Sequence, residues 1–250
     1  MHTHTLKIKT ILFVLILTCT AITGCSESNI NTYINDITSI TSESDTTTTT
    51  NTSNSDIPEY TGNAYVEINN NKPTFTNDEI TTTSFESYSD LDELGRCGVA
   101  EACIGTDIMP TEKRGQIGQV KPSGWHTVKY PEYISDNYLY NRCHLIGYQL
   151  TGENANEKNL ITGTRYLNVT GMLPFENEVA DYIKETNNHV MYRVTPLFVN
   201  DELVARGVYI EAYSVEDNGA GVSYNVYCFN IQPHITIDYA TGDSYVTKEQ

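Results

Sequence analysis

Residues 140–176 decide the fold, and they read YNRCHLIGYQLTGENANEKNLITGTRYLNVTGMLPFE. Two short runs, 138–144 and 160–164, have the composition of strands. The polar segment 147–158 lies between them and is predicted to be a loop. The best helix of the chain follows over residues 174–186. The stretch therefore predicts a strand, a second strand and a helix in immediate succession.

The predicted helix carries one anomaly, an acidic residue on its apolar face. Glu176 lies inside a stripe of apolar residues at helical spacing, formed by Met172, Phe175, Val179 and Ile183. An inward-facing carboxylate is costly unless a charged or hydrogen-bonding group meets it. A hydrated metal ion would satisfy Glu176, and so would a salt bridge to a buried arginine. The residues alone leave both readings open.

The rest of the globular part is predicted to be mainly strands. Polar links with turn chemistry separate the last three of them. These strands are predicted over residues 60–69, 96–104, 125–130, 189–199, 203–215 and 222–232. The expected fold class is therefore α+β, a mainly antiparallel sheet with one functional helix.

Candidate chemistry gathers on the two short strands and just before the helix. Arg142 and His144 end the first strand, and an imidazole near its unperturbed pKa can accept a proton from water. A lone histidine is more often a structural residue than a catalytic one. Asn159 and Asn168 follow, and amide oxygens are suitable ligands for magnesium, which takes few protein ligands.

Five of these residues together resemble the signature of the DNA/RNA non-specific endonuclease family, in the branch of the DNA-entry nucleases. They are Arg142, His144, Asn159, Asn168 and Glu176. The signature is Asp-Arg-Gly-His, then a strand with Asn, then Asn followed eight residues later by Glu on a helix. The resemblance covers most of residues 96–240. It implies a ββα-metal catalytic unit of the His-Me finger type.

The resemblance implies a role for each matching residue in hydrolysing DNA, and RNA as well, to 5′-phosphates. His144 would be the general base, and Asn168 would hold Mg²⁺, or Mn²⁺ in its place. Glu176 would complete the metal shell, and it and Asn159 would orient the metal's waters. Arg142 would stabilise the developing negative charge. Arg165 is expected to contact the substrate.

Two positions depart from the family signature. Asn141 stands where the signature has Asp, and Cys143 where it has Gly. A side chain at position 143 would matter if the backbone there needed a positive φ. These departures and the acidic composition support an alternative, a non-catalytic surface lipoprotein that binds nucleic acid on a degenerate nuclease scaffold. A solute-binding lipoprotein fits less well, since it expects a longer, two-lobed chain.

The charge distribution is compatible with a polyanionic substrate although the formal net charge is −17. Residues 26–96 hold 13 acidic and 2 basic residues, whereas residues 113–165 hold 4 acidic and 7 basic ones. Lys113, Arg114 and Lys121 are candidates for phosphate contacts, or else belong to a solvated loop. His126 is a candidate for stacking on an unpaired base, or else an exposed strand residue.

The N-terminus is predicted to direct the chain out of the cytoplasm. Residues 1–24 combine a basic start with a short apolar run, as secretory signals do. The ending Ile22-Thr23-Gly24-Cys25 resembles a bacterial lipobox, which predicts a lipid on Cys25 and a membrane anchor; a plain cleaved signal and a secreted protein are the alternative. Residues 25–56 form a polar tether expected to be disordered, and residues 57–250 the endonuclease domain.

Overall fold

The structure, a computed structural model, describes residues 57–248. The predicted signal segment 1–24, the lipid site at Cys25 and the tether 25–56 lie outside the described residues. Within residues 57–248, no helix combines the length and apolar character that a membrane span requires.

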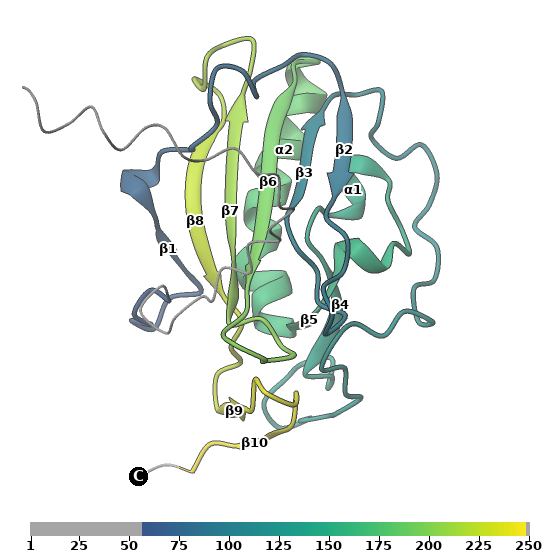
Figure 1. Cartoon of the computed structure of the whole chain (residues 1–250), viewed down its shortest axis with the longest axis vertical. Helices are drawn as coiled ribbons and strands as arrows, with labels where there is room; N and C mark the ends of the chain where they lie inside the picture. Colours follow the sequence, from purple (N-terminus) through teal and green to yellow (C-terminus); the bar gives the residue numbers. More distant parts are fainter. Residues whose placement is uncertain (1–56, 249–250) are drawn as a thin grey trace, which may run out of the picture. The chain divides into compact units, whose positions relative to one another are not determined.

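A six-stranded antiparallel sheet forms one layer of the described unit (Figure 1). Its strands are β1 (Tyr65–Glu67), β2 (Phe85–Tyr88), β3 (Ala100–Ile104), β6 (Val190–Leu197), β7 (Gly207–Ser214) and β8 (Ser223–Phe229). They lie in the order β1-β8-β7-β6-β3-β2. The expected α+β class with a mainly antiparallel sheet is confirmed.

The second layer contains a strand pair and two α-helices. β4 (Tyr140–His144) and β5 (Leu160–Thr164) form their own antiparallel ladder, in which Arg142 faces Thr162 and His144 faces Leu160. Between them lie α1 (Tyr148–Thr151) and the 3-10 turn η3 (Glu157–Asn159). After β5 come the π-helical turn η4 (Leu167–Met172) and α2 (Leu173–Thr186). Both α-helices lie behind the large sheet in Figure 1. A last small pair joins β9 (Ile235–Ile237) to β10 (Ser244–Val246).

The helical segment begins earlier than the sequence predicts. Thr164 Oγ1 accepts a hydrogen bond from the Leu167 N–H at 2.9 Å, as an N-cap does. Pro174 then lies in the first turn of α2, and Asn187 ends the helix with a φ of 60°. The helix 174–186 is therefore confirmed, but the π turn before it left no sequence signal.

The prediction of a strand over residues 125–130 is wrong. Its only ladder contact among the described residues is an isolated bridge between Lys129 and Tyr138. Two backbone hydrogen bonds flank this bridge, Tyr130 N–H to Asn137 O at 2.8 Å and Leu139 N–H to Val128 O at 3.1 Å. The segment therefore forms a tight ribbon with residues 137–139 and does not join the large sheet.

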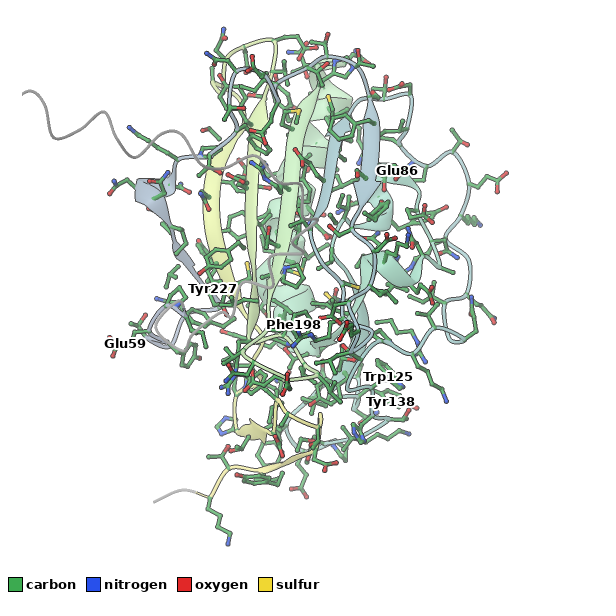
Figure 2. The ribbon with its side chains drawn as sticks, viewed as in Figure 1. Glu59, Glu86, Trp125, Tyr138, Phe198 and Tyr227 are labelled. Carbon is green, nitrogen blue, oxygen red and sulfur yellow. The ribbon has the colours of Figure 1, made fainter. Side chains whose placement is uncertain are left out.

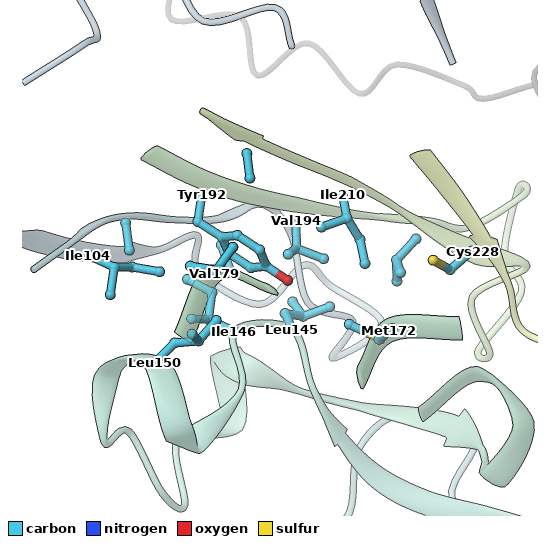
Figure 3. Close-up of a cluster of buried hydrophobic side chains, with 14 of the residues drawn as sticks. Ile104, Leu145, Ile146, Leu150, Met172, Val179, Tyr192, Val194, Ile210 and Cys228 are labelled. Carbon is cyan, nitrogen blue, oxygen red and sulfur yellow. The ribbon is translucent and has the colours of Figure 1, made fainter. Parts of the chain in front are cut away.

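The main core fills the space between the two layers (Figure 3). Tyr192, Val194 and Ile210 contribute from the sheet, and Val179 and Met172 from the helical side. Burying such side chains is the main favourable term of folding, at roughly 1.5–3 kcal/mol for each large one. The four cysteines of this unit, Cys97, Cys103, Cys143 and Cys228, are buried and unpaired.

Two buried asparagines fix the strand pair in place. Asn230 accepts the Thr164 N–H at 2.8 Å and donates to the Thr162 and Ala205 carbonyls, at 3.0 and 2.8 Å. Asn159 accepts the Ile146 N–H at 2.9 Å and donates to the Ile146 carbonyl at 3.0 Å. The first residue joins β5 to the end of the large sheet. The second continues the β4 ladder past His144 through its side chain.

The expected role of Asn159 in orienting metal-bound water stays a prediction that this arrangement does not support. The residue has no exposed surface, and both polar atoms of its side chain are bound to Ile146. Its amide is therefore occupied in holding the backbone that follows the candidate base.

The Asn159→Ala substitution is expected to destabilise the protein. It leaves the buried N–H and C=O of Ile146 unpaired, at a cost of roughly 1–3 kcal/mol for each group. Urea unfolding followed by the fluorescence of Trp125, the single tryptophan, measures the loss of unfolding free energy. Asn63→Ala, an exposed asparagine, is the matched control. Equal stability of the two variants would contradict the assigned role.

Candidate active site

A cleft of about 870 Å³ lies beside β4 and the start of the helical segment. It collects six of the residues singled out from the sequence. They come from β4, from the helical segment and from the loop before Trp125, and they are Arg114, Arg142, His144, Arg165, Asn168 and Glu176.

His144 is buried at the wall of the cleft, with only 6% of its surface exposed. Its Nε2 lies 2.8 Å from the backbone oxygen of Asn154. Because a carbonyl only accepts, this contact assigns the proton of the neutral ring to Nε2 and leaves a lone pair on Nδ1. Burial lowers the pKa of His144 to about 4, and the nearby Arg114 guanidinium also lowers it. The imidazole is therefore a neutral proton acceptor at pH 7.

Glu176 faces inward as the helical pattern predicts, and it is only 8% exposed. Burial raises the pKa of its carboxyl to about 7, against the opposing influence of Arg114 and of hydrogen bonds from Gln149 and the Gly147 N–H. A Cβ on Gly147 would lie 2.7 Å from the carboxylate, so only glycine permits this approach. None of the ion pairs within residues 57–248 involves Glu176, which weakens the salt-bridge reading.

The side chain of Asn168 is oriented from two sides. Its Nδ2 donates to Asn141 Oδ1 at 3.1 Å, and its Oδ1 accepts from the Cys143 thiol at 3.2 Å. Asn141 Oδ1 also lies 3.4 Å from Arg165 Nη1, and Arg165 Nε pairs with Asp136 at 2.9 Å. A chain of contacts thus runs from Asp136 to the amide that the sequence proposes as metal ligand.

The two departures from the family signature are both accommodated. Asn141 supplies the same kind of acceptor oxygen to Asn168 that an aspartate would supply. Cys143 lies in the extended strand β4 and is absent from the positive-φ residues of the described chain, so no glycine is needed there. The thiol is buried beneath Asn168, also within 3.5 Å of the Met172 sulfur.

The π turn explains why an eight-residue step can join Asn168 to Glu176. On an ideal α-helix, eight residues separate two side chains by about 80° around the axis. A π turn holds more residues per turn, and here the Leu173 N–H bonds to Asn168 O, five residues back. The extra residue reduces that angle, and both side chains line the cleft.

The donors near Asn168 and Glu176 suit a hard divalent cation. No group of three or more His, Cys, Asp or Glu side chains in residues 57–248 is arranged to hold a metal. Magnesium does not require one, because it keeps several waters and takes one or two protein oxygens. The amide oxygen of Asn168 and the buried carboxylate of Glu176, both lining the cleft, fit that demand.

Arg142 lines the cleft, but two of its guanidinium nitrogens are hydrogen-bonded to the neighbouring loop. Its Nε donates to Val120 O and its Nη2 to Gly118 O, the latter at 2.7 Å. The guanidinium also lies 4.1 Å from the centre of the Trp125 ring, a cation–π contact. Arg142 therefore clamps the loop 118–125 against β4.

Arg114 is the guanidinium nearest to the candidate base. Its Nη2 lies 3.4 Å from His144 Nδ1, the ring nitrogen that carries the lone pair. No carboxylate of the described residues forms an ion pair with it. The sequence named Arg114 only as one of three basic residues on a loop.

Three further substrate-binding candidates lie outside the cleft lining. Lys113 and Lys121 are exposed and do not contribute to it. His126 Nε2 lies 3.1 Å from Thr241 O, and its Nδ1 lies 3.9 Å from Asp243. Its neighbours Trp125 and Thr127 line the cleft, whereas His126 does not. The predicted stacking of His126 on a base finds no support in this position.

The sequence did not predict two features of the cleft. Asn154 orients His144 through its backbone carbonyl, which every residue possesses, so no residue type marks it. Tyr138 lines the cleft with 42% of its surface exposed. In the sequence, Tyr138 begins the strand predicted over residues 138–144, and nothing distinguishes it from the other tyrosines of the chain.

Comparison with known proteins agrees with this geometry. The profile of the DNA/RNA non-specific endonuclease family matches residues 76–216. The crystal structure of NucA from Streptococcus agalactiae with bound magnesium is 28% identical, covering 72% of this chain and 86% of NucA, with a TM-score of 0.64. NucA without metal is also 28% identical, covering 78% of this chain and 92% of NucA, with a TM-score of 0.66.

The Sda1 nuclease with bound zinc is 26% identical, covering 75% of this chain and 97% of Sda1, with a TM-score of 0.60. The family match spans more than half of the chain and includes β4, β5 and α2, which carry the cleft residues. The chain therefore belongs to the DNA/RNA non-specific endonuclease family and is a hydrolase of the nuclease class.

Proposed function

We propose that the chain is a metal-dependent, sequence-non-specific endonuclease that hydrolyses the phosphodiester bonds of DNA and RNA and leaves 5′-phosphates. One observation carries the proposal. A neutral imidazole with its lone pair on Nδ1 shares a cleft with Asn168 and Glu176. Proton acceptor and cation donors are the two components that attack by water on a phosphate needs.

His144 acts as the general base. Its Nδ1 takes the proton of the attacking water, and the Nε2–H stays bonded to the Asn154 carbonyl. That bond holds the ring at one angle and stabilises the imidazolium that forms. The 3.4 Å contact with Arg114 occupies the edge of the ring at Nδ1, where the attacking water must stand, so Arg114 would have to move towards the phosphate when substrate enters.

Asn168 and Glu176 would hold Mg²⁺, with Mn²⁺ as an alternative. The bound ion would act as a Lewis acid on phosphate oxygens and on the leaving oxygen. Asn141 and Cys143 keep the Asn168 amide in one orientation, and a bound cation would stabilise the ionised Glu176 carboxylate that burial disfavours. The magnesium in NucA and the zinc in Sda1 support divalent metal use.

Positive charge on the remaining cleft residues would neutralise the phosphate. Arg114 is positioned for the charge that develops at the reacting centre, and Arg165 for a neighbouring phosphate. Arg142 contributes chiefly by holding the loop 118–125, which follows Arg114 in the chain and ends at Trp125. Contacts of this kind position the strand and carry no sequence information, which accounts for non-specific cutting.

The site of action is proposed from the sequence alone. A signal over residues 1–24 and a lipid on Cys25 would anchor the protein outside the cytoplasmic membrane, and cleavage without lipidation would release it. The polar segment 25–56 would separate the endonuclease domain 57–250 from the membrane surface.

Plasmid cleavage tests the enzyme directly. With Mg²⁺, the purified protein is expected to convert supercoiled plasmid into nicked and then fragmented DNA, and EDTA is expected to stop it. His144→Ala should lower the rate by about 10²–10⁴-fold, the usual cost of removing a general base. His126→Ala is the matched histidine control and should keep full activity. Full activity of His144→Ala would remove this residue from the mechanism, and tight plasmid retention without cutting would favour a binding protein.

The pH profile tests the buried state of His144. The assay is run at saturating Mg²⁺, which would keep the Glu176 carboxylate ionised although burial raises its pKa to about 7. Only the neutral His144 ring accepts a proton, and its pKa is lowered to about 4, so activity is then expected to persist as pH falls and to decline near pH 4. Arg114→Gln removes a neighbouring positive charge and should move this limb to higher pH. The logarithm of kcat/KM plotted against pH gives both limbs. A limb near pH 6.5 in the unmodified enzyme would show that the ring is solvated.

A further inference from the structure

The aromatic side chains that residues 125–140 contribute to the cleft are in different states. Arg142 covers the Trp125 ring, and Tyr140 is buried with its hydroxyl bonded to Gly242 O at 2.9 Å. Tyr138 is 42% exposed. Figure 2 shows Trp125 and Tyr138 in the same corner, below the large sheet. Of these three rings, Tyr138 is the only exposed one, and Lys129 lies over one of its faces, which leaves the other face for a ligand.

The backbone that carries Tyr138 is held firmly. Tyr138 pairs with Lys129 across the small ribbon, between the two flanking hydrogen bonds described above. The next side chain, Leu139, is fully buried in a separate core with Ile134 and Ile237. An exposed ring on a fixed backbone binds a flat ligand with little loss of conformational entropy.

A cation lies over one face of the ring. Lys129 Nζ lies 4.6 Å from the ring centre, and Arg165 lines the same cleft. An aromatic face beside cations matches one nucleotide of a single strand, whose base stacks while its phosphate is neutralised. In an intact duplex each base is already stacked between its neighbours, so its face is not available to the ring.

We propose that Tyr138 is a stacking platform for an unpaired base next to the phosphate that is cut, and that it gives the enzyme a preference for single-stranded or locally opened nucleic acid. The inference rests on the proposed nuclease function and specifies its substrate class. It assigns Tyr138 to substrate selection and leaves the proton transfer at His144 unchanged.

Binding measurements with the His144→Ala protein in EDTA separate this inference from catalysis. The probes are a fluorescein-labelled oligothymidylate strand and a labelled, fully paired hairpin of equal length, followed by fluorescence anisotropy. Adding Tyr138→Ala should raise the Kd for the single strand by roughly 5- to 100-fold and leave the Kd for the hairpin unchanged. Tyr138→Phe keeps the ring and should keep the affinity.

Tyr133→Ala is the matched control. Tyr133 is 39% exposed on the same segment, but its ring lies against His234 outside the cleft lining. The proposal is overturned if Tyr138→Ala leaves single-strand binding unchanged, if it weakens both probes equally, or if the parent protein binds no single strand. Failure of the nuclease function itself would appear separately, as an intact plasmid with the unmodified protein and Mg²⁺.

Discussion

Desolvation of two ionisable side chains in one cleft is the constraint on which the rest of the site depends. His144 and Glu176 are each less than a tenth exposed. Burial favours the neutral form of both groups, because it lowers the pKa of the imidazole and raises the pKa of the carboxyl. A protein tolerates such burial only where fixed partners compensate for the lost water. The carbonyl of Asn154 meets the imidazole, and Gln149 and the Gly147 N–H meet the carboxylate at the wall of the cleft. The scaffold around these two groups serves to keep them close and oriented.

The orientation comes from amides and backbone more than from ion pairs. Asn159 holds Ile146 beyond the end of β4, Asn230 ties β5 to the large sheet, and Asn141 fixes Asn168. Amide side chains both donate and accept, so each joins two backbone or side-chain groups at once. They also carry no charge that would compete with a metal or a phosphate. This chemistry explains why Asn141 can stand where the family signature has an aspartate.

The basic residues of the cleft differ in what holds them. Arg142 is committed to two loop carbonyls and the Trp125 ring, and Arg165 to Asp136 and Asn141. Arg114 has a single weak contact, with the base itself. Cations with fixed partners shape the cleft, whereas one without such partners is able to move with the substrate. The acidic net charge of the chain does not oppose this, because the cationic groups are concentrated at the cleft.

Sequence patterns alone predicted the antiparallel α+β class, the helix over residues 174–186 and the inward face of Glu176. Hydrophobic periodicity and helix-end residues are local features, so they can be recognised in the sequence without knowledge of the fold. The family resemblance named His144, Asn168 and Glu176 through their spacing. Only the tertiary structure decided that Asn159 supports the backbone, that His126 lies outside the cleft lining, and that Tyr138 opens into the cleft. Those outcomes depend on contacts between segments that are distant in the sequence, and the type of a residue does not reveal which residues it contacts.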